Sequence, residues 1–198
     1  MASTSPEIKA VIFDFAGVIG VDGYWAWLRD NIADLNAEER FFHDISYQVD
    51  RAELTELQFL DRIHGKCGIP IDQIRNEIIG RLKIDQGVVG IIENLKPAYK
   101  TALLSNFIFE WLDRILIEND LYRLFDQAVI SSAHAMAKPE PEIFQKTAGL
   151  LGLKPAETVF IDDRAVNIEA AERLGMRGLL FTSAEGLRAD LASLDIAV

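Results

Sequence analysis

The sequence has few of the features that mark secreted, membrane or nucleic-acid-binding proteins. Cys67 is its one cysteine, so the chain cannot form an internal disulfide, and we expect a cytoplasmic protein. No stretch approaches the roughly 18 uninterrupted apolar residues of a transmembrane helix. Lys and Arg number 20 against 31 Asp and Glu, a net charge of -11. Nucleic acid and anionic membranes bind basic surfaces, so we expect neither as a partner.

The sequence also lacks internal repeats and any linker rich in Pro, Gly and Ser. Residues 1–6 are small and polar, without the basic start and apolar segment of a signal peptide, so we expect a short frayed tail there. With 198 residues, of which 49% are apolar, the chain can form one domain, or one domain with an insert. We expect a monomer or a homodimer.

Short apolar runs alternate with amphipathic helical patterns along most of the chain. Such runs, rich in β-branched residues, are typical of buried parallel strands. The alternation predicts an α/β fold with a doubly wound, Rossmann-like parallel sheet and helices on both faces. The expected strands are residues 8–13, 101–104, 128–130, 158–161 and 178–181.

One long stretch, residues 20–96, contains helical patterns and no convincing strand. Asp72 can cap one helix of this stretch and Asp85 the next. We therefore expect an all-helical cap domain at residues 20–96, inserted into a core domain formed by residues 1–19 and 97–198.

Polar residues follow the expected strands where ligands bind in open parallel sheets, beyond the carboxyl ends. Carboxylates that are brought together repel one another unless a cation joins them, and Mg²⁺ prefers such hard oxygen ligands. A carboxylate can then attack a metal-bound phosphate, while hydroxyl and ammonium groups stabilise its other oxygens. The residues concerned are Asp14, Ser105, Asn106, Lys138, Asp162 and Asp163.

Four sequence motifs contain these residues. They are VIFDFAGV around Asp14, LLSN ending at Asn106, KPEPEIF starting at Lys138, and VFIDDRAVNIEAAERLG around Asp162 and Asp163. In order and spacing, the motifs resemble those of the haloacid dehalogenase-like (HAD) hydrolases. The later motifs are most similar to sugar-phosphate phosphatases and to the phosphatase domain of soluble epoxide hydrolase. The helical insert resembles the small helical cap of that group.

This resemblance implies a Mg²⁺-dependent hydrolase that acts on small phosphorylated compounds through an aspartyl-phosphate. Asp14 would be the nucleophile and a metal ligand, and the backbone carbonyl of Ala16 a second ligand. Asp163 would be the main carboxylate of the fourth motif, with Asp162 beside it, bound directly or through water.

The remaining motif residues would bind the phosphate. By the same resemblance, Ser105 and Asn106 would hold it, and Lys138 would neutralise the charge of phosphate and nucleophile. Asn167 stands where many members of the family have a supporting Asp.

One departure from the family pattern affects the chemistry. Family phosphatases have a second Asp two positions after the nucleophile, which acts as general acid and base, and here that position is Ala16. A positioned proton-transfer group contributes about 10²–10⁴-fold to the rate. One alternative is a phosphatase that is slow or uses leaving groups that need little protonation, such as acyl or aryl phosphates.

Two further alternatives follow from the same departure. The first is a phosphonatase- or dehalogenase-type reaction. A phosphonatase-type reaction would use a cap lysine to form a Schiff base with the substrate, and Lys66 and Lys83 are the candidates. Dehalogenases also lack the second Asp, but they usually have Tyr where this chain has Ala16. The protein could also be a catalytically silent member that binds a ligand or partner.

Aromatic residues open the expected cap directly after the first motif. Tyr24, Trp25 and Trp27 are interpreted chiefly as packing residues of the cap, with lining of a substrate pocket as the alternative. Among the histidines, His134 lies nearest to the expected active edge and is a minor candidate for substrate contact.

Overall fold

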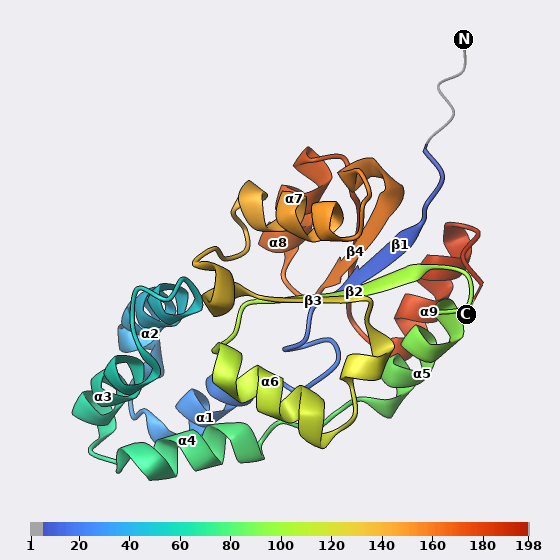
Figure 1. Ribbon diagram of the computed structural model, residues 1–198. Helices are drawn as coiled ribbons and strands as arrows, with labels where there is room; N and C mark the ends of the chain where they lie inside the picture. Colours follow the sequence, from blue (N-terminus) through green and yellow to red (C-terminus); the bar gives the residue numbers. More distant parts are fainter. Residues whose placement is uncertain (1–5, 198) are drawn as a thin grey trace.

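The computed structural model describes residues 6–197, so most of the expected N-terminal tail lies outside the described residues. Within that range, five parallel strands form a single sheet in the order β3-β2-β1-β4-β5, with β1 at its centre. This arrangement confirms the doubly wound parallel sheet expected from the sequence (Figure 1). The strands are β1 (Ala10–Phe13), β2 (Lys100–Ser105), β3 (Gln127–Ile130), β4 (Thr158–Asp162) and β5 (Arg177–Leu180).

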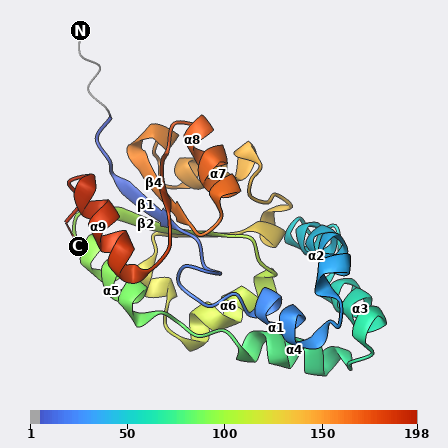
Figure 2. The same cartoon turned by 180° about the vertical axis from the view of Figure 1, so that it is seen from behind.

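Helices cover both faces of the sheet because successive strand side chains point to opposite faces. In β1, Val11 and Phe13 pack with one layer of helices, while Ala10 and Ile12 pack with the other. All four side chains are fully buried, as expected for a central parallel strand. The first layer contains α5 (Gln86–Leu95), α6 (Phe109–Glu118) and α9 (Ala184–Ser193), and the second contains α7 (Pro141–Leu150) and α8 (Ala165–Arg173), as Figure 2 also shows.

Four helices between β1 and β2 pack together as a separate layer beside the sheet. They share one apolar cluster, which includes the fully buried Trp27 and Leu60. Ile108 and Trp111, at the start of α6, join the same cluster and connect it to the sheet. These helices are α1 (Gly23–Asn31), α2 (Leu35–Asp50), α3 (Glu56–Cys67) and α4 (Ile71–Gly80).

The fifth helix of this stretch, α5, packs with the sheet core and not with α1–α4. Its buried side chains, among them Val88 and Ile92, belong to the same cluster as Val11 and Phe13. The division into a cap at residues 20–96 and a core of residues 1–19 and 97–198 stays a prediction. The packing favours a shorter cap that ends before α5.

The two expected helix caps of this stretch have different outcomes. Asp85 caps α5 as expected, with its carboxylate accepting hydrogen bonds from Gly87 N and Val88 N. The expectation for Asp72 was wrong, because α4 begins two residues earlier and Pro70 occupies its N-cap position. Asp72 lies in the first turn instead, where its carboxylate accepts a hydrogen bond from Arg75 Nη1 at 2.6 Å.

Three short 3-10 helices lie in the loops next to β3 and β4. One follows β3 directly, so the chain turns sharply before it reaches Lys138. They are η1 (Tyr122–Leu124), η2 (Ser131–His134) and η3 (Pro155–Glu157). Over residues 6–197, none of the helices has both the length and the apolar character that crossing a membrane requires.

Candidate active site

Three charged side chains meet at the carboxyl end of the sheet. Asp14 directly follows β1, Asp162 ends β4, and Lys138 lies in the loop between β3 and α7. Lys138 Nζ lies 2.8 Å from Asp14 Oδ1 and 2.6 Å from Asp162 Oδ2, and all three residues are buried. Because β1 and β4 are paired in parallel, their ends deliver both carboxylates to the same ammonium group.

Hydrogen bonds fix the position of this cluster. Lys138 N donates to Asn106 Oδ1 at 2.8 Å, and Asn106 Nδ2 donates to Lys138 O at 2.9 Å. The Asn106 carboxamide therefore holds the Lys138 backbone. The carboxylate of Asp162 accepts from Arg164 N at 2.8 Å and from Asn167 Nδ2 at 3.0 Å, so Asn167 supports Asp162.

The electrostatics of the cluster favour a positive Lys138 paired with the carboxylates of Asp14 and Asp162. Burial raises the pKa of Asp14 to about 7, an effect that Lys138 opposes and that Asp162 and Asp163 reinforce. Burial disfavours the charged form of Lys138, but Asp14 and Asp162 outweigh burial and raise the pKa of this ammonium above its ordinary value. Lys138 is therefore a fixed positive charge against the nucleophile candidate.

Asp14, Asp162 and Asp163 offer carboxylate oxygens that lie within 4.8 Å of one another, which suits a hard divalent cation. Asp162 already accepts bonds from Lys138, Arg164 and Asn167, whereas Asp163 is exposed. The Asp163 carboxylate lies against Gly17, where an added Cβ would be 2.2 Å from Asp163 Oδ2. The donor set therefore fits Mg²⁺ with Asp14 and Asp163 as its available carboxylates.

Ser105 ends β2 beside this cluster. Its hydroxyl is buried, and it has no hydrogen-bond partner among residues 6–197. A buried hydroxyl without a partner is costly unless a ligand satisfies it. This position therefore suits an anionic ligand oxygen.

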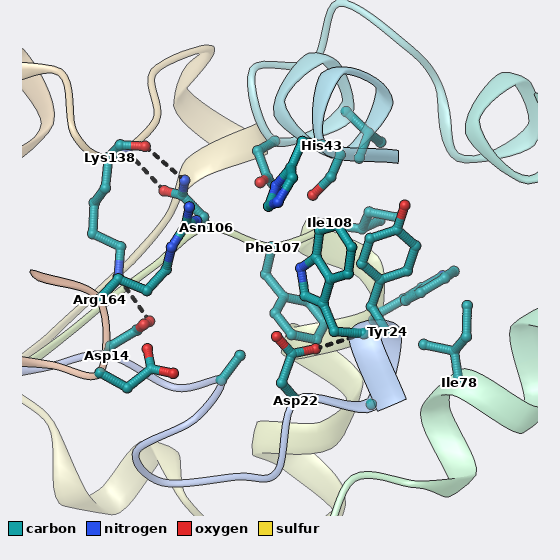
Figure 3. Close-up of a pocket in the computed structure, with 18 of the residues that line it drawn as sticks. Asp14, Asp22, Tyr24, His43, Ile78, Asn106, Phe107, Ile108, Lys138 and Arg164 are labelled. Atoms are coloured by element: carbon teal, nitrogen blue, oxygen red, sulfur yellow. Dashed lines mark hydrogen bonds and ion pairs between the residues drawn. The ribbon is translucent and has the colours of Figure 1, made fainter. Parts of the chain in front are cut away.

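A cavity of about 560 Å³ opens above Asp14 and Lys138 and extends between the sheet edge and helices α1, α2 and α4. In Figure 3, Asp14 and Lys138 lie at one end of it, and Tyr24 and Ile78 at the other. Tyr24 and Trp25 line the cavity, as does Phe107 from the β2–α6 loop. Trp27 instead is buried in the cap, and its Nε1 donates to Glu77 Oε2 at 2.7 Å.

Five charged residues of the cavity were not singled out from the sequence: Asp22, Arg29, Glu39, Asp50 and Arg164. Asp22 accepts a hydrogen bond from Trp25 N as the N-cap of α1, and Arg164 directly follows the two aspartates. Both could have been found from these positions. Asp50 ends α2 and reaches the cavity only through the packing of the cap, so no local signal marks it.

Several minor candidates do not line the cavity. Lys66 forms an ion pair with Glu38 at 2.7 Å on the cap surface, and Lys83 lies in the connection between α4 and α5. His134, on η2, is also absent from the cavity wall. The alternative of a cap lysine that forms a Schiff base therefore loses both of its candidates.

Comparisons with known proteins agree with this geometry. Curated relatives include a D-ribitol-5-phosphate phosphatase of Bacteroides thetaiotaomicron, 26% identical over 183 residues, which cover 85% of this chain and 89% of that protein. Flavin mononucleotide hydrolase 1 of Arabidopsis thaliana is 44% identical over 61 residues, so the match spans 31% of this chain and 25% of that protein.

Solved structures include a HAD family enzyme from Bacteroides thetaiotaomicron in complex with magnesium and inorganic phosphate. It is 27% identical, with a TM-score of 0.71 and coverage of 88% of this chain and 94% of that chain. The sequence profile of haloacid dehalogenase-like hydrolases matches residues 8–175. This chain therefore belongs to the haloacid dehalogenase-like hydrolases.

Proposed function

We propose that this hydrolase is a Mg²⁺-dependent phosphatase of small phosphorylated metabolites, with Asp14 as the nucleophile. The observation that carries the proposal is the buried cluster of Asp14, Lys138 and Asp162, with Asp163 beside it, at the floor of a cavity. The relatives that act on ribitol phosphate and flavin mononucleotide, and the family enzyme bound to magnesium and phosphate, support this reading.

Mg²⁺ would be held by Asp14 and Asp163, with the Ala16 carbonyl as the backbone ligand implied by the family resemblance. When bound, this ion neutralises negative charge on the phosphate and on the carboxylates. Asp162 has a supporting role in this assignment, because its oxygens already bind Lys138, Arg164 N and Asn167.

The chain's own residues prepare Asp14 for attack on phosphorus. Asp14 Oδ1 is held by Phe15 N at 2.7 Å and by Lys138 Nζ at 2.8 Å, which leaves Oδ2 to face the substrate. Lys138 disperses the charge of the nucleophile and of a bound phosphate. The hydroxyl of Ser105, which has no partner among the described residues, would donate to a phosphate oxygen.

The substrate beyond the phosphate would lie against aromatic walls. Trp25 lies edge-on to Tyr24 at a centroid distance of 5.4 Å and is tilted against His43 at 4.2 Å, which makes an aromatic surface on the cap side. Arg29 and Arg164 add positive charge to the same cavity. This lining favours a small anionic metabolite with a planar or apolar portion.

A metal-dependent phosphate-release assay on a panel of phosphate monoesters tests the proposal. We expect the wild type to release phosphate with Mg²⁺ and not with EDTA, and Asp14→Asn to abolish release because the nucleophile is lost. Asp61→Asn, an exposed residue of α3, is the matched control and should match the wild type.

The result against the proposal would be phosphate release that does not require Asp14 or Mg²⁺, or no release from any ester of the panel. The second result, together with binding of phosphate to the folded protein, would favour the catalytically silent alternative that Ala16 suggests.

A further inference from the structure

The reaction proposed above needs a proton donor that the first motif does not supply. Ala16 has no ionisable side chain, so the leaving-group oxygen must take its proton from elsewhere. In phosphoryl transfer the attacking and leaving oxygens lie roughly in line on opposite sides of phosphorus. With Asp14 at the floor of the cavity, the leaving oxygen faces the wall made by the cap helices.

Three carboxyl groups line this part of the cavity: Asp22, Glu39 and Asp50. Asp22 is engaged as the N-cap of α1, accepting from Trp25 N at 3.1 Å. Glu39 lies near the start of α2, where it is 3.8 Å from the exposed His43. Asp50 ends the same helix, and both Lys138 and Asp14 act on it electrostatically.

Contacts between the cap and the core hold the end of α2 over the site. Tyr47 Oη donates to Glu140 Oε1 at 2.6 Å, and Arg51 forms an ion pair with the same carboxylate. Glu140 lies two residues after Lys138. In sequence, Asp50 lies between two residues, Tyr47 and Arg51, that bind the core loop carrying Lys138. Its own carboxylate has no hydrogen bond or ion pair among residues 6–197.

The surroundings of Asp50 keep a proton on its carboxyl group near neutral pH. Burial raises the pKa of Asp50 to about 8, while Lys138 and Arg164 oppose this effect and Asp14 and Asp22 reinforce it. Tyr24 also faces this group, and burial, Asp50 and Asp22 hold its pKa well above the ordinary value. A group that titrates close to the working pH is suited to give and take back a proton.

We propose that Asp50 is the general acid and base of this enzyme and replaces, from the cap, the aspartate that Ala16 lacks. In the first step Asp14 forms a bond to phosphorus, the bond to the leaving oxygen breaks, and that oxygen takes the proton of Asp50. In the second step the Asp50 carboxylate takes a proton from water as its oxygen attacks phosphorus. The bond to Asp14 breaks, and inorganic phosphate, free Asp14 and protonated Asp50 result.

The inference rests on the proposed phosphatase activity and is tested by Asp50→Asn with two leaving groups. For an alkyl phosphate, whose leaving oxygen needs a proton, we expect kcat/KM to fall about 10²–10⁴-fold. For p-nitrophenyl phosphate, whose leaving group needs none, kcat/KM should change by less than about tenfold. A burst of one nitrophenolate per enzyme should precede slow turnover, because the second step lacks its base.

The pH profile gives an independent readout. The wild-type kcat/KM for the alkyl phosphate should fall as pH rises above about 8, where Asp50 loses its proton, and Asp50→Asn should lack this decline. Asp44→Asn, on the exposed face of the same helix, is the matched control and should keep both rates and the profile.

Equal losses for both esters, or no loss for either, would overturn the assignment of Asp50. A retained burst with p-nitrophenyl phosphate shows that the variant is folded and that Asp14 still attacks. Failure of the phosphatase proposal itself would appear differently, as release that survives Asp14→Asn or is absent in the wild type.

Discussion

Gly17 leaves no room for a side chain beside the proposed metal ligand Asp163. Its φ of +88° lies in the left-handed region that favours glycine, and an added Cβ would lie 2.2 Å from Asp163 Oδ2. The turn that follows Asp14 is closed by Gly17 N donating to Gly20 O at 2.7 Å. The position therefore couples the backbone of the first motif to the carboxylate of the fourth.

We expect Gly17→Ala to weaken Mg²⁺ binding by about 10- to 100-fold, because the new methyl group displaces Asp163 from its place beside Asp14. The left-handed backbone should also cost about 1–2 kcal/mol of unfolding free energy. Calorimetric titration with Mg²⁺ alone measures the first effect without relying on activity, and urea denaturation measures the second.

Gly68→Ala is the matched control for this change. Gly68 ends α3 with a φ of +70°, and an added Cβ would have no neighbour within 4 Å. It should lose a similar amount of stability and bind Mg²⁺ as the wild type does. Equal Mg²⁺ affinity in both glycine variants would contradict the role given to Gly17.

Residues at strand ends could be proposed from sequence, because parallel strands bring their carboxyl ends to one edge. Asp14, Lys138 and Asp162 were expected there, and the structure brings their side chains together. Their individual catalytic roles stay predictions. The partners of Asn106 could not be predicted, since its carboxamide binds the backbone of a residue 32 positions away.

Among the elements, the end of α2 decides how the cap meets the core. Tyr47 and Arg51 both bind Glu140, and Trp111 Nε1 of α6 donates to Glu56 Oε1 at 2.7 Å at the start of α3. Partly exposed ion pairs contribute little to global stability. We infer that these contacts serve chiefly to fix where the end of α2, with Asp50, lies at the cavity.

We expect Glu140→Ala to change unfolding free energy by less than about 1 kcal/mol, yet to loosen α2. Amide hydrogen exchange at the end of α2 should become faster, and KM for an alkyl phosphate should rise as the cap wall loses its position. Both measurements use the intact protein.

Glu118→Ala provides the comparison, since among residues 6–197 the ion pair of Glu118 lies within α6, with Arg114 at 2.7 Å. It should leave the exchange of α2 and the kinetics unchanged. Unaltered exchange in Glu140→Ala would show that the contacts to Glu140 do not hold the cap.

Helix boundaries show where local sequence signals suffice and where they do not. Asp85 caps α5 as predicted. Asp72 does not cap α4, because the helix begins at Ile71 and Pro70 occupies the N-cap position. The helical nature of residues 23–95 could be predicted from periodicity. The packing of α5 against the sheet could not be predicted, because an apolar stripe on a helix does not indicate which surface covers it.

For the whole molecule, the net charge of -11 gives a poor description of the site. The cavity contains three cations, Arg29, Lys138 and Arg164, among its carboxyl groups, so even an acidic protein offers local positive charge to an anion. The doubly wound sheet followed from alternating patterns over the whole chain. The cavity could not be predicted, since it forms where the cap helices meet the sheet edge.

The central claim is that Asp14 carries the phosphoryl group. Rapid acid quench of the wild type during turnover of p-nitrophenyl phosphate with Mg²⁺, followed by peptide mass spectrometry, tests it most directly. We predict one phosphoryl group on the peptide that contains Asp14, which accumulates further in Asp50→Asn and is absent from Asp14→Asn. Turnover without phosphorylation of Asp14 in the wild type and in Asp50→Asn, or phosphorylation of another residue, would contradict the account.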